Sequence, residues 1–340
     1  MGSSPSVPPP ALAPEFRAAF LRGADAEGAM SFARFMEIAL YDPRVGYYRR
    51  DRARVGYGRG TDFFTASTSG PLFGELVVAA CVTLLGGRKP SDYVFVEIGA
   101  ESVNPAEGGP DAGVLAGVKH PFASVRTARR GDQLAIEGRC VVFSNELFDA
   151  QPFRRFVFRG GAWRELGVAL GGDALAEIEL LSPPTDAFLP STAPEGYHID
   201  APAAATTLAK QIITQPWTGL FVACDYGKTW RELTEATPQG TARAYFRHTQ
   251  SNDLLARPGE QDLTCHVCWD WLADVLASTG FAPPIVETQE AFFIHHAVEF
   301  IAATSMAEAA RMSQRKRSLM QLLHPAHLGQ KFQVLHAIRD

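Results

Sequence analysis

Polar residues follow three short apolar runs of the chain, each at the point where the run ends. The runs are Tyr93–Ile98, Cys140–Phe143 and Leu220–Cys224. The groups that follow them are Gly99-Ala100-Glu101, Ser144-Asn145-Glu146 and Asp225-Tyr226-Gly227. None of the runs alternates apolar and polar residues, which is typical of parallel strands buried on both faces. Because open α/β sheets bind ligands outside the carboxyl ends of their strands, these groups predict one shared site.

Each of these groups offers a different chemistry to a ligand. A glycine at position 99 lets backbone N–H groups approach a bound ligand closely. The amide of Asn145 and the carboxylate of Glu146 suit the orientation of a nitrogen nucleophile or the removal of its proton. The alternative is that Asn145 caps a helix starting at Glu146. Asp225 is either a site residue or a helix cap, and we favour the site.

The elements that must position these groups follow from periodicity and caps. Ser31 caps a helix predicted over Phe32–Leu40, and a second helix starts near Pro71. Glycine pairs separate Phe153–Phe158, Trp163–Leu170 and Leu175–Leu181, which predicts an antiparallel meander over about 153–181. The remaining predictions are a strand at Phe122–Thr127, helices at Ala203–Gln215 and Cys265–Thr279, a helix opened by Ser305-x-x-Glu308 that runs to about Leu323, and a strand at Lys331–Ile338.

Two histidine- and cysteine-containing segments raise the question of a metal site. Cys265 and Cys268 share one face of the predicted helix with Trp269 and Leu272, so both are expected to be buried thiols without metal or disulfide. A second ligand pair at zinc-finger spacing is missing. His295-His296 stands in an apolar, strand-like run and is interpreted as packing. We therefore predict no metal.

Composition excludes several classes of protein. The 340 residues are 46% apolar and 20% charged with a net charge of −5, so wholesale disorder and a nucleic-acid footprint are excluded. No apolar run is long enough for a membrane span. Five cysteines make no disulfide framework, and no secretory signal precedes them, so a reducing, cytoplasmic setting is expected. The expected organisation is a mobile tail at 1–30, a helical lid segment at 31–90, and an α/β core at 91–340.

Several strings along the chain resemble the MidA-like family, which includes a mitochondrial arginine methyltransferase that assists respiratory complex I assembly. They occur in the family's order from about residue 31 onward. The strings are Phe35-Met36-Glu37-Ile38-Ala39-Leu40-Tyr41, Gly46-Tyr47-Tyr48, Asp62-Phe63-Phe64-Thr65-Ala66, Pro71-Leu72-Phe73-Gly74-Glu75, Asn145-Glu146, Asp149-Ala150-Gln151-Pro152, Asp225-Tyr226-Gly227, Gly259-Glu260-Gln261-Asp262-Leu263-Thr264, His324-Pro325 and Lys331-Phe332.

This resemblance implies an α/β fold with a Rossmann-like class I methyltransferase sheet, an N-terminal helical segment and the inserted meander. It also implies S-adenosylmethionine as cofactor, methyl transfer to a protein arginine nitrogen, and a protein substrate or assembly partner. The residues it implies for catalysis are Asp62, Glu146 and Asp149, since carboxylates grip a guanidinium in a bidentate manner. Those it implies for cofactor binding are Phe63, Thr65, Glu97, Gly99, Ala100, Asn145 and Asp225.

The chain departs from the family pattern on the cofactor side. Glu101, Ser102 and Val103 replace the next glycines of the loop, and Glu101 brings negative charge toward the methionine carboxylate of the cofactor. Only 41 residues separate Ile98 from Cys140, and the acid that usually binds the ribose has no clear equivalent, since Asp132 suits a turn. These departures predict weak or absent affinity for S-adenosylmethionine.

Two other functions are therefore compared with the enzyme. A non-catalytic relative with the same fold, serving as a binding or assembly factor, remains the alternative. A nicotinamide-dependent dehydrogenase is disfavoured, because GxGxxG is missing after the first strand and Glu97 precedes the loop. The sequence leaves the acceptor and the oligomeric state open.

Overall fold

The computed structural model describes residues 12–49, 71–100, 113–129, 132, 135–310 and 313–340. The chain divides into two compact units, and each is discontinuous in sequence. The first comprises residues 1–51, 150–204 and 231–266, and the second comprises residues 52–149, 205–230 and 267–340.

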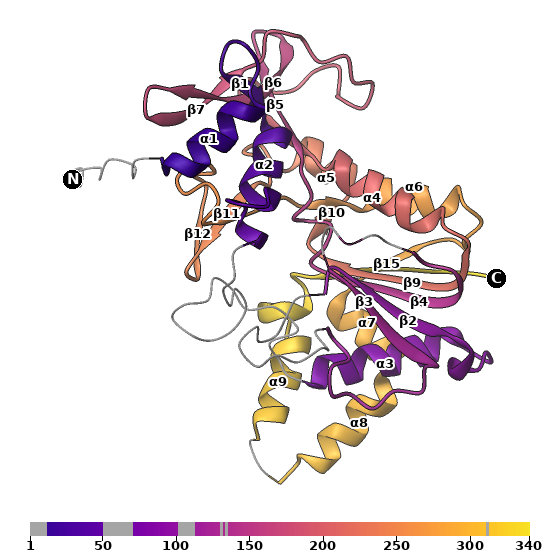
Figure 1. The fold of residues 1–340 in the computed structure, drawn as a ribbon. Coiled ribbons are helices and arrows are strands. Elements are labelled where there is room, and N and C mark those ends of the chain that lie inside the picture. The colour runs from indigo at the N-terminus through magenta and orange to yellow at the C-terminus, as the bar shows by residue number, and fades with distance from the viewer. Residues whose placement is uncertain (1–11, 50–70, 101–112, 130–131, 133–134, 311–312) are drawn as a thin grey trace. The chain divides into compact units, whose positions relative to one another are not determined.

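A six-stranded sheet forms the centre of the second unit (Figure 1). Its strand order is β15-β16-β9-β4-β2-β3. The bounds are Val94–Ile98 for β2, Ser124–Ala128 for β3, Gly138–Asn145 for β4, Trp217–Asp225 for β9, Ile285–Thr288 for β15 and Gln333–Arg339 for β16. Strands β3, β2, β4 and β9 are parallel, and β16 runs antiparallel between β9 and β15. The three predicted apolar strands are thus direct neighbours with their carboxyl ends at one edge, as expected.

Helices cover both faces of this sheet (Figure 1). One face carries α3 (Pro71–Leu85), α7 (Gln289–His296) and α9 (Gln314–Leu323), and α8 (Val298–Ala307) contacts α3 and α7. The other face carries α4 (Ala203–Ile213) and α6 (Trp269–Ala277). The remaining elements of this unit are β10 (Gly227–Lys228), β14 (Val267–Cys268), η3 (Pro90–Asp92) and η5 (Pro325–Gly329).

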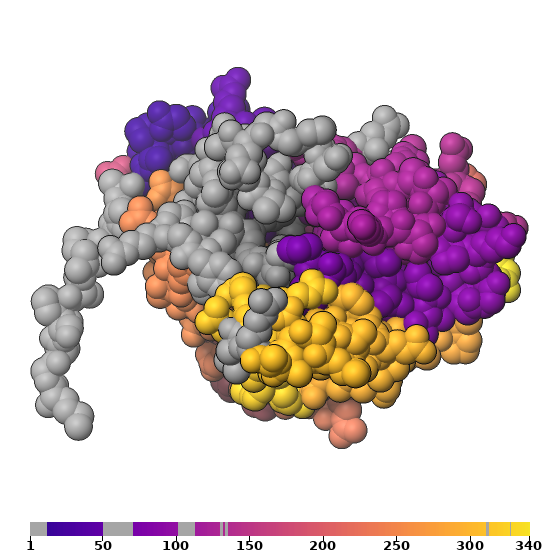
Figure 2. All heavy atoms as spheres, turned by 90° about the horizontal axis from the view of Figure 1, so that it is seen from below, coloured from indigo at the N-terminus to yellow at the C-terminus, as the bar shows by residue number. Residues whose placement is uncertain are grey.

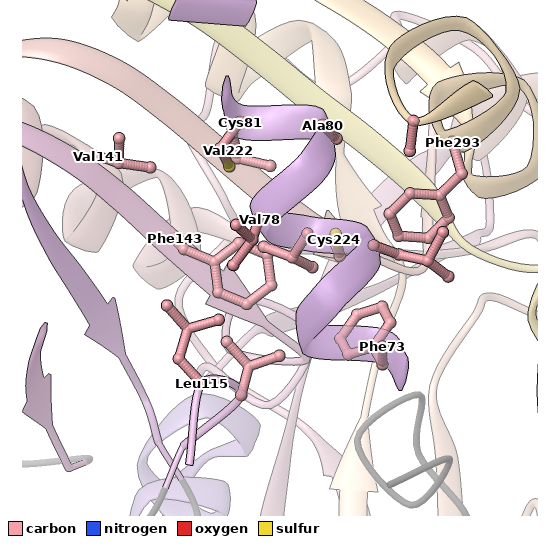
Figure 3. Packing of buried hydrophobic residues seen from close by; sticks show 14 of the residues in the cluster. Phe73, Val78, Ala80, Cys81, Leu115, Val141, Phe143, Val222, Cys224 and Phe293 are labelled. Atoms are coloured by element: carbon pink, nitrogen blue, oxygen red, sulfur yellow. The ribbon is translucent and has the colours of Figure 1, made fainter. Parts of the chain in front are cut away.

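Two apolar cores, one on each face of the sheet, explain why successive apolar residues of β4 point to opposite faces and are all buried. On β4, Val141 and Phe143 pack toward α3, while Cys140 and Val142 pack toward α4 and α6. Figure 3 shows Phe73, Val78 and Cys81 of α3 near side chains of the sheet. In Figure 2, α8 and α9 lie beside α3 on one face of the molecule.

The first unit is built on antiparallel strands. Its main sheet has the order β1-β6-β5-β8, and β7 pairs with β6. The bounds are Ala29–Ser31 for β1, Arg154–Arg159 for β5, Ala162–Gly171 for β6, Ala174–Glu179 for β7 and His198–Ala201 for β8. The predicted meander is therefore confirmed as β5, β6 and β7. Its turns use Gly160, Gly161 and Gly172 at positive φ, which glycine adopts without steric cost.

Helices and a small sheet complete this unit. Ser31 caps α2 as predicted, because its hydroxyl accepts the N–H of Arg34. The elements are α1 (Pro14–Gly23), α2 (Phe32–Tyr41), η1 (Tyr47–Arg49), α5 (Trp230–Glu235), β11 (Arg243–Phe246), β12 (Thr249–Ser251) and β13 (Asp262–Thr264). No helix in the described part of the chain is long and apolar enough to cross a membrane.

Two predicted helices have different bounds in the structure. The helix expected from Cys265 begins only at Trp269, because residues 267–268 pair with β10 as strand β14. Cys265 and Cys268 therefore share no helical face, although both are buried and free of disulfides. The helix expected from Ser305 is two helices. Ser305 lies inside α8, and Ser313 caps α9 by accepting the N–H of Lys316.

One further local prediction was wrong, and one open alternative is excluded. His295 and His296 end helix α7 rather than lying in a strand, because Thr288 caps that helix by accepting the N–H of Ala291. Asn145 caps no helix, since the chain turns at residues 146–151. Helix geometry is excluded at Glu146 itself, whose φ is +51°.

Candidate active site

The strand order places one topological switch point in the parallel part of the sheet. From β2 the chain goes to β3 on one side, and then to β4 on the other side of β2. Open α/β sheets bind ligands outside the carboxyl ends of the two strands that flank such a point. Gly99 and Ala100 leave β2 here, and Asn145 and Glu146 leave β4. These four predicted residues therefore gather at the place where the fold provides a crevice.

Gly99 cannot carry a side chain without disturbing this place. Its φ is +81°, and a Cβ built on it would lie 2.8 Å from Cδ1 of the buried Leu147. The N–H groups of Gly99 and Ala100 both donate to the carbonyl of Ala128 at the end of β3, at 2.8 and 3.2 Å. The loop after β2 is thus held close to the loop after β4, with only a hydrogen atom between Gly99 and Leu147.

Asp225 positions the loop that follows β4. Its carboxylate is fully buried at the end of β9. Oδ2 accepts the N–H groups of Phe148 at 2.9 Å and Asp149 at 3.3 Å, and Oδ1 accepts the N–H of Tyr226 at 2.9 Å. The N–H of Glu146 also donates to the carbonyl of Cys224 at 3.0 Å. Asp225 acts on this site by fixing the backbone that carries Glu146 and Asp149.

Asn145 and Glu146 are half-buried residues with unusual conformation and polarity. The left-handed φ of +51° at Glu146 is unfavourable for a residue with a Cβ, and such strain gathers at functional sites. Nδ2 of Asn145 donates to Oε1 of Glu146 at 3.1 Å. Within the described residues, the buried Oδ1 of Asn145 and Oγ of Ser144 find no hydrogen-bond partner. Buried polar atoms are normally satisfied, so these two atoms favour a ligand with polar groups.

Glu97 lies on β2 and is buried. Its Oε2 accepts the N–H of Val114 at 2.6 Å. Gly113 beside it has φ +133°, and a Cβ there would lie 2.5 Å from the same oxygen. Glu97 therefore ties residues 113–114 to the sheet. Burial raises the pKa of Glu97 to about 7, against the opposing effect of the Val114 hydrogen bond.

The raised pKa makes a prediction for Glu97→Gln. A carboxyl whose pKa rises from 4.5 to about 7 on folding stabilises the folded state below pH 4.5, and this contribution is lost as pH rises through 7. The native free energy of unfolding should therefore fall by about 2 to 3 kcal/mol more between pH 5 and pH 8 than that of the variant. Urea unfolding at the two pH values measures this. An equal fall of the free energy of unfolding in both proteins would contradict the raised pKa of Glu97.

Of the other predicted residues, one lies in the same loop as Glu146. Asp149 is buried in the loop after β4. Asp132 accepts the N–H of Arg129 at 2.7 Å and has the turn role expected for it. Asp62, Phe63, Thr65 and Glu101 lie outside the described residues.

Sequence reasoning missed three residues that shape the site. Leu147 fills the space beside Gly99, and Gly113 and Val114 surround the carboxylate of Glu97. Gly113 is one of several glycines in its segment, so spacing alone could not single it out. The only signal for Leu147 was its position between Glu146 and Phe148.

Burial keeps the thiols of Cys224 and Cys268 protonated. It raises the pKa of Cys268 to about 12 and that of Cys224 well above its ordinary value. Both are therefore neutral thiols at physiological pH and behave as small apolar side chains.

Comparisons with known proteins show what this chain is similar to. A family model described as "Putative S-adenosyl-L-methionine-dependent methyltransferase" matches residues 123–286. The resemblance to the MidA-like family is confirmed. The curated protein arginine methyltransferase NDUFAF7, mitochondrial, of Danio rerio is 23% identical to this chain, and the match covers 91% of this chain and 83% of that protein.

Two solved structures have the same fold as this chain. A protein from Burkholderia thailandensis bound to S-adenosyl-homocysteine has a TM-score of 0.77 and 23% identity, and the match covers 97% of this chain and 95% of that one. A native crystal structure of a protein from the same organism has a TM-score of 0.76, again with 23% identity and the same coverage. The predicted Rossmann-like methyltransferase sheet with its N-terminal helices and inserted meander is therefore confirmed.

Proposed function

We propose that this protein is an S-adenosylmethionine-dependent methyltransferase that acts on an arginine nitrogen of a protein in the cytoplasm. The observation that carries the proposal is the pair Asn145-Glu146, with the strained φ of Glu146, beside Gly99 at the switch point of the sheet. The family match supports the reaction class, and the distant similarity to an arginine methyltransferase supports the acceptor.

The residues at the switch point fit the cofactor. Gly99 lets the loops after β2 and β4 approach each other closely, since a Cβ there would lie 2.8 Å from Cδ1 of Leu147, and the buried Oδ1 of Asn145 finds no partner among the described residues. Backbone C=O groups after β2 and the amide of Asn145 would hold the cofactor. When bound, S-adenosylmethionine supplies an electrophilic methyl group on a sulfonium.

Carboxylates on the loop after β4 suit the acceptor. Glu146 is half-buried and Asp149 is buried; Asp225 accepts the N–H of Asp149, and the carbonyl of Cys224 accepts the N–H of Glu146. A guanidinium donates paired N–H groups that match a carboxylate, and a nitrogen that gains a methyl group must lose a proton. Glu146 is assigned to hold the guanidinium and accept that proton. The resemblance adds Asp62 to this role, and Asp62 lies outside the described residues.

Transfer of a radiolabelled methyl group to proteins of a cell lysate tests this proposal. After acid hydrolysis, label should appear in methylated arginine, and Glu146→Gln should lower the rate by about 100-fold or more. Glu137→Gln is the matched control, because Glu137 is exposed at the opposite end of β4. Label in lysine or in small molecules would contradict the acceptor.

A complete absence of transfer has a different meaning. If the native chain nevertheless binds S-adenosylhomocysteine, the acceptor was missing from the lysate and a defined arginine-rich peptide replaces it. If the chain does not bind that product, the non-catalytic assembly factor becomes the better account. Glu101 and the short interval before Cys140 are the sequence features that favour this alternative.

A further inference from the structure

A second cluster of reactive side chains lies away from the switch point. Glu287 on β15, His296 at the end of α7 and His336 on β16 turn their polar atoms toward one another. The Nε2 atoms of both histidines lie 3.0 Å from Oε2 of Glu287. The three candidate ligand atoms lie within 4.8 Å of one another, and this is the one such group found among the described residues.

The spacing of these atoms is close to that of a coordination sphere. Zinc ligands at about 2.0 to 2.1 Å from the metal lie roughly 3.3 Å apart in a tetrahedron. Small rotations of the side chains would bring the observed atoms to that separation. The side chains of Glu287, His296 and His336 are 13%, 20% and 5% exposed, so the cluster is enclosed but reachable from solvent.

The surroundings also orient the cluster for metal binding. Nδ1 of His295 contacts the other carboxylate oxygen of Glu287, which leaves Oε2 for the two imidazoles. Outer partners of this kind commonly fix metal-ligating carboxylates.

We propose that Glu287, His296 and His336 form a binding site for a divalent transition-metal ion, and that this ion is Zn²⁺. Two imidazoles and a carboxylate suit zinc and its neighbours rather than calcium or magnesium. The ion would join β15, α7 and β16, three elements that no disulfide connects, and water would complete its coordination. The site serves the stability of this edge of the sheet and makes no use of the methyl-transfer residues.

A cluster without metal explains the same distances in another way. Two neutral imidazoles can donate their Nε2 protons to one carboxylate oxygen. Clusters that contain exposed acidic side chains are common without a bound ion. The two accounts differ for Glu287→Gln. Its amide oxygen still accepts both hydrogen bonds, whereas the loss of charge weakens a bound divalent cation.

Calorimetric titration of the chelator-treated full-length chain with ZnCl₂ distinguishes the accounts. One ion should bind per chain and raise the melting temperature, and Co²⁺ should produce the visible absorption of a tetrahedral site. Glu287→Gln and His296→Gln should each weaken zinc binding by about 100-fold, while the control His248→Gln should not. Circular dichroism verifies that the variants fold, and His296→Gln changes a partly exposed residue at a helix end. The proposal is overturned if no saturable binding occurs, or if both variants bind zinc as the native chain does.

Discussion

Asp225→Ala is expected to lower the free energy of unfolding by about 4 kcal/mol and to abolish methyl transfer. The buried carboxylate accepts the N–H groups of Phe148, Asp149 and Tyr226. Removing it leaves these donors buried without an acceptor, and each such group costs about 1 to 3 kcal/mol. The loop after β4 would lose its fixed backbone, and Glu146 and Asp149 would lose their positions. Urea unfolding followed by circular dichroism measures the stability, and label transfer measures the activity.

Two variants make this result specific. Asp225→Asn keeps an oxygen for Phe148 and Asp149 but turns an NH₂ group toward the N–H of Tyr226, so about half of the loss is expected. Asp132→Ala removes an exposed acid that accepts one N–H in a turn, and its effect should stay below about 1 kcal/mol. A loss for Asp225→Ala no larger than that for Asp132→Ala would contradict its positioning role.

Gly99→Ala is expected to weaken the binding of S-adenosylhomocysteine by about 100-fold. The new Cβ would adopt an unfavourable positive φ and press against Leu147, whose displacement would move the neighbouring residues Asn145 and Glu146. The strain in φ alone costs about 1 to 2 kcal/mol of stability. The collision adds a rearrangement at the crevice itself. Isothermal calorimetry with the two proteins measures the change in affinity.

Gly138→Ala separates backbone strain from damage to the site. Gly138 also has a positive φ, +74°, but a Cβ built on it would meet nothing within 4 Å, and it starts β4 at the opposite edge of the sheet. This variant should lose a similar amount of stability through φ and keep the affinity of the native chain. Equal loss of affinity in both variants would show that Gly99 has no special place in binding.

The sheet was predictable because its strands are buried on both faces. Val141 and Phe143 face one core and Cys140 and Val142 face the other, so the whole run had to be apolar. Because the strands are parallel, the residues after each run had to meet at one edge of the sheet, independently of the positions of the helices. The meander was equally accessible, because glycine turns separate its strands.

Contacts between distant segments account for what sequence reasoning missed. The pattern after Cys265 is helical, but the pairing of Val267 with Gly227 in β10 overrides it for the first residues. His295-His296 looked like packing because Glu287 and His336 become neighbours only when β15 pairs with β16. Periodicity within one segment carries no information about such partners.

Some residues of the candidate site were predictable from the sequence and others were not. The positions of Gly99, Asn145 and Glu146 were predictable, since each lies at the end of a strand or directly after it. The role of Asp225 as a backbone acceptor depends on Phe148 and Asp149, which lie in a loop without a repeating pattern. The partner of Glu97 was hidden for the same reason, since Val114 is 17 residues away.

Calorimetric titration with S-adenosylhomocysteine tests the central claim most directly, namely that this chain binds its cofactor at the switch point. The native chain and Glu101→Gly are compared, because the sequence predicts that Glu101 brings negative charge toward the carboxylate of the cofactor. We expect one binding site in both proteins, with weaker binding by the native chain, by about tenfold or 1.4 kcal/mol. Absence of binding by both proteins would contradict the claim and leave the fold as that of a non-catalytic relative.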